Sequence, residues 1–310
     1  MTSSPPTSTE ESRPPLAWRD HAKTFRRWVR YHLVAGLIRL IERQPLTALP
    51  RLRRLLLKVF PLVFAAQTRR AAELLPAEFA PRREAILRGM TVNQVMNLLE
   101  IFFYEKLLAA RPDLVQIEGG EHLERARQAG RGLIVLAAHF GNWELQAYTL
   151  VRLGLPLHVI ARPQALDQMT AFMNSFRERR GVRVLMANNL TESLRLLGQG
   201  AAIGIVSDLD AKEHGFLVPF FGRPASFYPT PVILSVRGRA PLLPMFMERQ
   251  ADGSHRLCIE PPLVWERGES MTARIRRYVE RYEAAFRRRP DLWVWFHERY
   301  AHAHLARVEP

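Results

Sequence analysis

The spacing of apolar residues along the chain changes character once. From residue 17 to about residue 110, apolar positions recur at mixed three- and four-residue intervals, with breaks expected at Pro45, Pro50, Pro61 and Pro81. A last stripe of this kind runs from Met96 to Leu107. Such spacing is typical of amphipathic helices. We therefore expect the first third of the chain to be helical.

After residue 110, short apolar runs alternate with amphipathic ones. We expect strands over residues 114–117, 133–138, 157–161, 182–185, 201–206, 241–247 and 256–260. We expect helices over residues 120–129, 142–153, 166–180, 191–197 and 272–288, the last ending before Pro290. Continuous apolar strands separated by helices indicate βαβ units. The predicted fold class is therefore α/β, with a mainly parallel central sheet flanked by helices and an N-terminal basic amphipathic helical segment.

Positive charge is concentrated in the helical part of the chain. The net charge is +15, and residues 19–70 contain 13 Lys or Arg against two acids, Asp20 and Glu42, so this stretch alone carries +11. Because its cations alternate with apolar residues, the stretch fits helices that lie on an anionic membrane surface. Nucleic-acid binding is the rival interpretation, but the chain has no zinc-ligand spacing and no RNA-binding signature. A solvated basic face on a soluble protein is the plainest alternative.

Residues 1–16 and the length of the apolar runs indicate the cellular location of the protein. Residues 1–16 are rich in Ser, Thr, Pro and Glu and lack the apolar core of a signal peptide, so we expect a disordered leader and a cytoplasmic location. No uncharged apolar run approaches the roughly 20 residues that a spanning helix needs. We therefore predict peripheral attachment through residues 17–110, followed by an α/β domain over residues 111–310.

Several kinds of chemistry find little support in the sequence. The single cysteine, Cys258, has apolar neighbours and is expected to be a core thiol rather than a nucleophile. The histidines of the tail, His297, His302 and His304, lack further ligands, so no metal site is predicted. The chain has no phosphate-binding glycine loop, dinucleotide fingerprint or serine elbow.

Ionisable residues follow three of the predicted strands directly. His139 and Glu144 follow the second strand, Arg162 the third, and Asp208 and Asp210 the fifth. In an open parallel sheet, ligands bind beyond the carboxyl ends of the strands. These residues are therefore the candidates for a functional site.

His139 and Glu144 can cooperate only if the chain turns between them. Five positions on a continuous helix place two side chains about 140° apart. Gly141 supplies the freedom to turn, and Asn142 is suited to cap the following helix. Glu144 would then approach the imidazole and hold one ring nitrogen protonated, which leaves the other as a base for a hydroxyl.

With these residues in view, the chain resembles the lipid A late acyltransferases, the lauroyl and myristoyl transferase group of the glycerolipid acyltransferase superfamily. The segment from His139 to Glu144 resembles the hallmark of that family, a histidine followed by an acidic residue. Three further blocks are similar in the same order, and the resemblance covers residues 114 to 300. These blocks are Ala161–Pro163 with Arg177 and Gly181, Asp208–Asp210 through Val218–Gly222, and Pro290–His297.

The resemblance implies a transfer without a protein nucleophile or cofactor. His139 would act as general base on a glycolipid hydroxyl, and Glu144 would orient it. The acyl thioester would be carried by acyl carrier protein or coenzyme A, with membrane lipids and not nucleic acid as the other partners. The implied substrate-binding residues are Arg162, Asp208, Asp210, Asn142 and Arg177. Phe220–Gly222 would help to shape an acyl channel.

The resemblance also implies a location at the cytoplasmic face of the inner membrane, where attachment would be peripheral because the apolar stretches near the N-terminus are short. The acceptor stays open among lipid A precursors, mannosylated phospholipids, aminolipids and other glycolipids. Two other functions stay open as well. One is a thioesterase-like hydrolase, with water in place of the lipid hydroxyl. The other is a non-catalytic protein that binds a lipid surface or nucleic acid through the basic segment.

Overall fold

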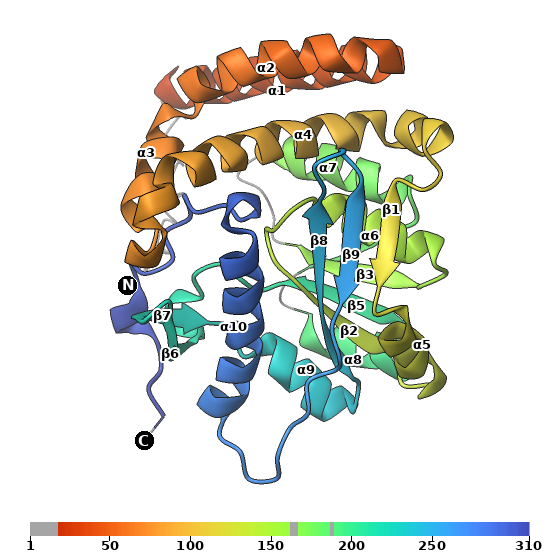
Figure 1. The fold of residues 1–310 in the computed structure, drawn as a ribbon, viewed down its shortest axis with the longest axis vertical. Helices are drawn as coiled ribbons and strands as arrows, with labels where there is room; N and C mark the ends of the chain where they lie inside the picture. Colours follow the sequence, from red (N-terminus) through yellow and green to blue (C-terminus); the bar gives the residue numbers. More distant parts are fainter. Residues whose placement is uncertain (1–17, 162–166, 187–188, 310) are drawn as a thin grey trace, which may run out of the picture.

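A sheet of seven strands forms the centre of the protein (Figure 1). The computed structural model describes residues 18–161, 167–186 and 189–309. In spatial order the strands are β1 (Val115–Glu118), β9 (His255–Ile259), β8 (Leu242–Arg249), β2 (Leu133–Ala137), β5 (Ala202–Val206), β3 (Leu157–Ala161) and β4 (Arg183–Met186). The pair β8–β9 is antiparallel, and the other neighbouring pairs are parallel. The predicted α/β class with a mainly parallel sheet is confirmed.

Helices cover both faces of the sheet because its central strands are apolar on both sides. In β2, Ile134 and Leu136 pack in one cluster with α9 (Thr230–Gly238) and α10 (Met271–Arg288). Leu133 and Val135 pack in a second cluster with α5 (Gly120–Gln128) and α6 (Trp143–Arg152). All five residues of β2 are buried. The continuous apolar pattern of this strand is thus the pattern of a sheet buried between two helical layers.

The other predicted helices of the α/β part are also present. They are α7 (Asp167–Glu178) and α8 (Leu190–Gly198), and each begins and ends close to its expected bounds. The stripe predicted for α10 is fully buried, at Ile275, Tyr278, Val279, Tyr282 and Phe286. Arg289 and Pro290 follow the end of this helix, as the sequence predicts.

A hairpin and α9 lie where the sequence analysis expected no regular elements. Strands β6 (Phe216–Phe220) and β7 (Arg223–Phe227) form a separate antiparallel sheet. Its turn places Phe221 in the left-handed region with φ of 47°, a conformation that seldom suits a bulky residue. Phe220 is 1% exposed and packs against Trp293 and Phe286. This side chain is therefore part of the core.

The N-terminal part is helical, as predicted. It consists of α1 (Trp18–Arg43), α2 (Leu49–Val63), α3 (Ala65–Leu74) and α4 (Arg83–Ala110), with short 3-10 turns over Leu46–Ala48 and Ala77–Arg82. The break expected at Pro61 is wrong, because this proline lies inside α2. It stands in the last turn of α2, which ends at Val63. The predicted leader, residues 1–16, lies outside the described residues.

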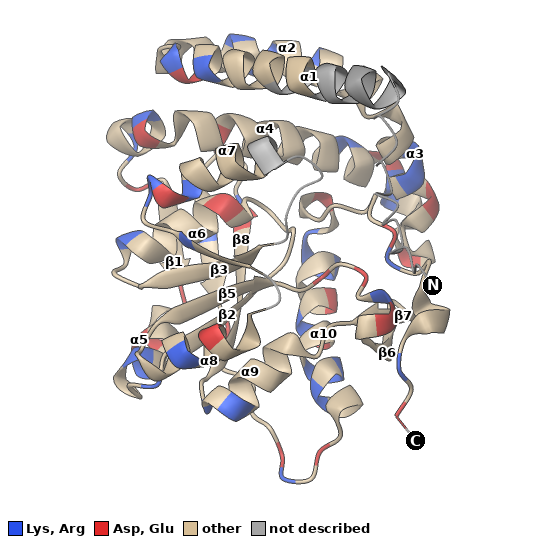
Figure 2. Cartoon of the chain, turned by 180° about the vertical axis from the view of Figure 1, so that it is seen from behind, with Lys and Arg blue, Asp and Glu red and all other residues tan. Residues whose placement is uncertain are grey.

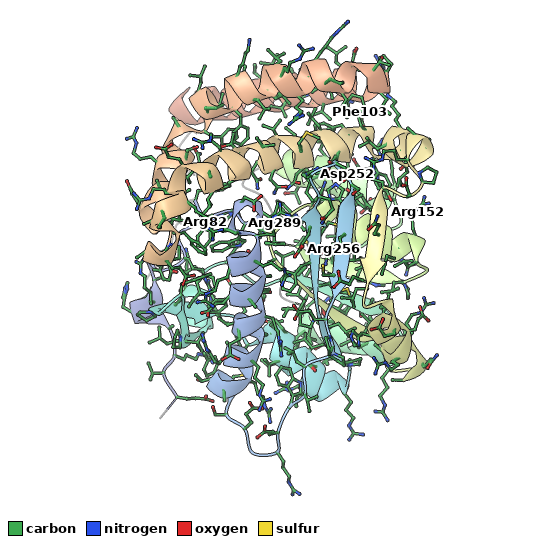
Figure 3. All side chains as sticks on the ribbon, viewed as in Figure 1. Arg82, Phe103, Arg152, Asp252, Arg256 and Arg289 are labelled. Atoms are coloured by element: carbon green, nitrogen blue, oxygen red, sulfur yellow. The ribbon has the colours of Figure 1, made fainter. Side chains whose placement is uncertain are left out.

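Helices α1 and α2 lie side by side on the outer side of α4 (Figures 1 and 2). An apolar cluster joins the three helices, and Phe103 of α4, which is fully buried, lies between the layers (Figure 3). In the part of the chain that the structure describes, no helix combines the length and the apolar character needed to cross a membrane. The apolar cluster makes α1 and α2 a layer packed against α4.

Candidate active site

His139 and Asp208 meet because they follow neighbouring strands in the same register. Ala137 of β2 pairs with Val206 of β5, and each candidate residue stands two positions beyond its strand end. The Nδ1 atom of His139 lies 2.9 Å from Oδ1 of Asp208. The backbone N–H of His139 donates to Oδ2 of the same carboxylate at 3.0 Å. The expectation that these strand ends converge is thus confirmed for this pair.

Asp208 is a buried carboxylate surrounded by donors. Its side chain is 1% exposed, and the indole N–H of Trp293 donates to Oδ2 at 2.7 Å. Burial alone raises the pKa of Asp208, but the His139 ring and the hydrogen bonds outweigh it and lower this pKa to about 2. Since an ionised carboxylate only accepts hydrogen bonds, Nδ1 of His139 carries the proton. In the neutral ring, the other nitrogen, Nε2, has a free lone pair, and it has no hydrogen-bond partner among the described residues.

Glu144 binds a different partner from the one that the sequence analysis expected. It accepts hydrogen bonds from Nε and Nη2 of Arg177, at 2.5 to 3.2 Å. Its side chain is 7% exposed and that of Arg177 is 20% exposed, so the ion pair is largely buried. The expectation that Glu144 holds the imidazole is wrong, because Asp208 already occupies Nδ1 and the turn directs Glu144 toward α7.

The turn between His139 and Glu144 contains the predicted glycine and the predicted helix cap, although it does not bring Glu144 to the imidazole. Gly141 has φ of 55°, and a Cβ atom at this position would lie 1.6 Å from the carbonyl oxygen of Met247. Only glycine fits there. The side chain of Asn142 accepts from the backbone N–H of Leu145 at 3.0 Å and caps α6. Both the glycine turn and the asparagine cap are confirmed.

The remaining predicted site residues lie in different surroundings. Arg162 lies outside the described residues. The side chain of Asn142 is buried, and its Nδ2 donates to Glu100. Asp210 pairs with His302 at 2.9 Å and accepts from the backbone N–H of Lys212. Within the described ranges, no group of three or more His, Cys, Asp or Glu residues is arranged to bind a metal ion.

Three residues near the site were not singled out as site residues from the sequence. Trp293 anchors Asp208, and the hydroxyl of Tyr282 donates to the carbonyl of Ala137, at the end of β2, at 2.7 Å. The ring of His297 lies 5.5 Å from that of His139. Burial, reinforced by the neighbouring His139, lowers the pKa of His297 to about 4, so this imidazole is neutral at neutral pH. The only available signal was that two of them fall in the Pro290–His297 block.

A cavity of about 490 Å³ opens beside His139. Its polar end is lined by His139, Glu144 and Arg177. Its apolar end runs between the sheet and α6, and it is lined by Val135, Ala147, Leu150, Leu157 and Val159. Phe220 and Phe221, which the sequence analysis expected to shape an acyl channel, are not among the lining residues. The arrangement combines a held base, a cationic side chain and an apolar chamber.

We compared the sequence of the chain with known protein families. The sequence profile described as bacterial lipid A biosynthesis acyltransferase matches residues 19–302. The chain belongs to this family. The match covers the N-terminal helices as well as the sheet, and the resemblance seen in the sequence is confirmed.

Curated relatives of this family member include proteins that act on two kinds of lipid. It is 29% identical over 189 residues to the lipid A biosynthesis palmitoleoyltransferase of Escherichia coli strain K12, a match that covers 59% of this chain and 60% of that protein. It is 29% identical over 145 residues to a phosphatidylinositol mannoside acyltransferase of Mycobacterium tuberculosis, covering 44% of this chain and 45% of that protein. A Mycolicibacterium smegmatis protein of the same name is 25% identical over 198 residues, with 60% and 61% covered. The chain thus matches about half to three fifths of the length of these relatives.

Proposed function

We propose that this family member is a membrane-peripheral O-acyltransferase. It would move a fatty acyl chain from an acyl thioester to a hydroxyl of a glycolipid, such as a lipid A precursor. The observation that carries the proposal is the placement of His139, held by the buried Asp208, at the polar end of an apolar cavity. The names of the relatives, which include both lipid A and phosphatidylinositol mannoside acyltransferases, support a glycolipid acceptor.

His139 acts as the general base in this proposal. Its Nε2 takes the proton of the acceptor hydroxyl while the hydroxyl oxygen attacks the thioester carbonyl carbon. The tetrahedral intermediate then collapses, the C–S bond breaks, and the leaving thiolate receives the proton from Nε2. Asp208 keeps Nδ1 protonated and stabilises the imidazolium between these steps. The scheme needs no protein nucleophile and no cofactor besides the thioester co-substrate.

Glu144 acts on Arg177 rather than on His139 in this scheme. The ion pair fixes the guanidinium in the cavity wall, where its charge can meet a phosphate or the developing oxyanion. Glu144 is therefore assigned to binding and positioning, and Asp208 takes over the orienting role that the sequence suggested for Glu144. The substrate-binding roles of Arg162, Asn142 and Asp210 stay predictions.

The apolar end of the cavity is assigned to the acyl chain of the donor. The volume of the whole cavity lies within the range of about 300 to 1,000 Å³ that is common for small-molecule sites. Each methylene that leaves water for such a chamber contributes about 0.8 kcal/mol. An apolar chamber that begins at the base would place the thioester carbonyl next to Nε2 and the hydrocarbon tail beneath α6.

The outer face of α1 and α2 supports attachment to a membrane surface. Leu33, Leu37 and Leu40 of α1 are 55 to 68% exposed and recur at the spacing of one helix face. On α2, Leu62 and Val63 are 80% and 65% exposed. Exposed leucines flanked by cations suit an anionic lipid interface, whereas a nucleic-acid backbone needs only the cations. We place this face on the cytoplasmic surface of the inner membrane.

Acyl carrier protein is proposed as the carrier of the donor chain, with coenzyme A as the alternative. Residues 19–70 carry +11, and Lys and Arg also occur on α5 and α10 (Figure 2). An acidic carrier would be attracted to such a surface. Parallel reactions with the two thioesters at low and high salt separate the carriers, because attraction between charged proteins is screened by salt.

The proposal is tested with purified protein, an acyl thioester and vesicles that contain a lipid A precursor. Mass spectrometry of the lipids should show the gain of one acyl chain, and His139→Ala should lower the rate at least about a hundredfold. The matched control is His158→Ala, a buried histidine of β3 that does not line the cavity. Full activity of the His139→Ala variant would contradict the proposed mechanism. Release of free fatty acid without acceptor acylation would instead indicate a hydrolase.

A further inference from the structure

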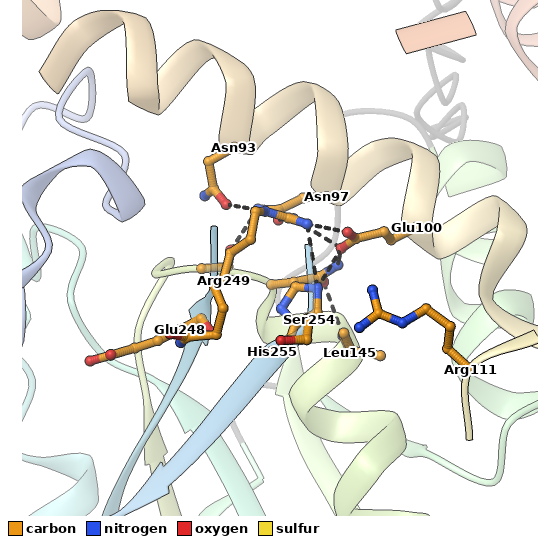
Figure 4. Close-up of polar contacts among 12 residues, drawn as sticks. Asn93, Asn97, Glu100, Arg111, Leu145, Glu248, Arg249, Ser254 and His255 are labelled. Atoms are coloured by element: carbon orange, nitrogen blue, oxygen red, sulfur yellow. Dashed lines mark hydrogen bonds and ion pairs between the residues drawn. The ribbon is translucent and has the colours of Figure 1, made fainter. Parts of the chain in front are cut away.

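A buried polar cluster joins α4 to the turn that follows His139 (Figure 4). At its centre, Glu100 of α4 is 4% exposed and forms ion pairs with Arg249 and His255. Arg249 also donates to the side-chain oxygens of Asn93, at 3.2 Å, and Asn97, at 2.8 Å. The cluster thus ties three side chains on one face of α4 to the end of β8 and the start of β9.

The same α4 side chains reach the segments that carry the site. Asn97 donates through Nδ2 to the carbonyl of Gly141 at 2.5 Å. Glu100 accepts from Nδ2 of Asn142 at 2.8 Å. Asn93 donates to the carbonyl of Leu292, the residue before Trp293, at 3.3 Å. One helix face therefore contacts both the turn after His139 and the segment that anchors Asp208.

Apolar packing alone would not require such a cluster. Buried ion pairs give up solvation, and well-packed apolar side chains of similar volume are often at least as stable in their place. Directional hydrogen bonds, however, fix orientation in a way that apolar contacts cannot. One bond of the cluster reaches the carbonyl of Gly141, which has no side chain of its own, and another reaches the side chain of Asn142 in the same turn.

We propose that Asn97 and Glu100 are positioning residues for the acyl transfer. Through Gly141 and Asn142 they hold the turn in the one arrangement in which His139 meets Asp208 and its Nε2 faces the cavity. The inference rests on the proposed role of His139 as the base. Neither residue lines the cavity, so both act through the turn and not on the substrate.

Two substitutions test this role. Asn97→Asp keeps an acceptor for Arg249 but replaces the donor to Gly141 with an oxygen, and Glu100→Gln removes the charge while keeping the shape. Each is expected to lower kcat at least tenfold, while KM for the acyl thioester changes less than twofold. Asn97→Asp is expected to lower kcat less than twofold further in an Asp208→Asn background, because the ring is then no longer held by that carboxylate.

Glu248 provides a matched control. It is as buried as Glu100, stands next to Arg249 in sequence, and pairs with Arg256 and Arg288, but it is directed away from the cluster (Figure 4). Glu248→Gln should lower the melting temperature by an amount comparable to Glu100→Gln and keep kcat within twofold of the wild type. An equal loss of kcat in Glu248→Gln, or unchanged kcat in both test variants, would overturn the proposal.

An NMR measurement separates this inference from the proposed function. The Nδ1 proton of His139, bonded to a carboxylate, should shift or exchange faster in Asn97→Asp and Glu100→Gln but not in Glu248→Gln. Loss of activity in His139→Ala with unchanged kcat and an unchanged proton signal in the test variants would refute only the positioning role. A changed proton signal in a protein that acylates no lipid would show that the two residues hold the His139 ring, but it would refute the proposed function and with it their role in acyl transfer.

Discussion

Trp293 and the backbone of His139 share one oxygen of Asp208. The indole N–H lies 2.7 Å and the backbone N–H 3.0 Å from Oδ2, so the tail of the chain and the end of β2 fix the same carboxylate. We expect Trp293→Phe to lower kcat about tenfold, because the carboxylate loses a donor and gains freedom to rotate. Steady-state kinetics on the folded variant check this. Unchanged kcat would mean that the backbone N–H and the ring of His139 are enough to hold the Asp208 carboxylate without Trp293.

The pKa of Asp208 makes a prediction about acid stability. Its folded-state pKa of about 2 is lower than the ordinary value of 3.8, so the group adds stability above the ordinary pKa and loses it as pH falls toward 2. The shift corresponds to roughly 2 kcal/mol. The difference in free energy of unfolding between wild type and Asp208→Asn should therefore shrink between about pH 5 and pH 2. Urea unfolding at several pH values measures it, and a constant difference would contradict the assignment.

The pairing of Glu144 with Arg177 distinguishes two roles for this acid. If Glu144 positions Arg177, Glu144→Gln should raise KM for the lipid acceptor about tenfold and change kcat less. Arg177→Met should have a similar effect, and the double variant should be little worse than either single one, since both remove one interaction. If the two single variants lower kcat additively in the double variant, Glu144 acts in the chemistry at His139 rather than on Arg177.

The cavity beneath α6 predicts a change in chain-length preference. Ala147→Leu adds bulk to the apolar end, so the products should shift to acyl chains shorter by about two to four carbons. Ala126→Leu is the control, because Ala126 packs in the same apolar cluster but does not line this cavity. Competition between thioesters of different length, read by mass spectrometry, gives the preference. The same product distribution in both variants would show that the chain lies elsewhere.

The exposed leucines of α1 give a test of the proposed membrane attachment. Leu33→Glu combined with Leu37→Glu should lower binding to anionic vesicles at least tenfold, because both side chains leave the apolar face. Attachment through an apolar face should also persist in part at high salt. Vesicle sedimentation measures both effects. Binding that survives the double substitution but disappears with salt would indicate a purely electrostatic surface.

The sequence was sufficient to predict the sheet and the place of His139 at its edge, but not the residue that holds the His139 ring. Continuous apolar runs predicted β2 and β5, and His139 and Asp208 became candidates because they directly follow these strands. Which acid meets the imidazole depends on strand register and on the direction of the turn at Gly141, and neither can be read from spacing. Glu144 was nearer in sequence, whereas Asp208 is nearer in space because β2 and β5 are neighbours.

Other features had weak or misleading signals. Asn97 and Glu100 look like ordinary polar positions of an amphipathic helix, and only the folded chain shows that they are buried. The hairpin of β6 and β7 contains Pro219 within a strand and Phe221 at a left-handed turn position, both uncommon choices. The backbone preferences of these two residues disfavour the hairpin, and burial of its aromatic side chains in the core outweighs this cost.

Helix α4 belongs to two parts of the protein at once. One face forms the apolar seam with α1 and α2, and the other contacts the turn after His139. A shortened protein that starts after residue 110 would lose Asn97 and Glu100 together with the proposed membrane face, so under the proposed mechanism we expect it to be a poor catalyst on its own. Exchange of residues 18–82 between relatives, however, would leave every α4 contact to the turn intact. If the two proposals hold, the proposed membrane face can therefore be exchanged without disturbing the proposed chemistry, provided that the exchange point lies before α4.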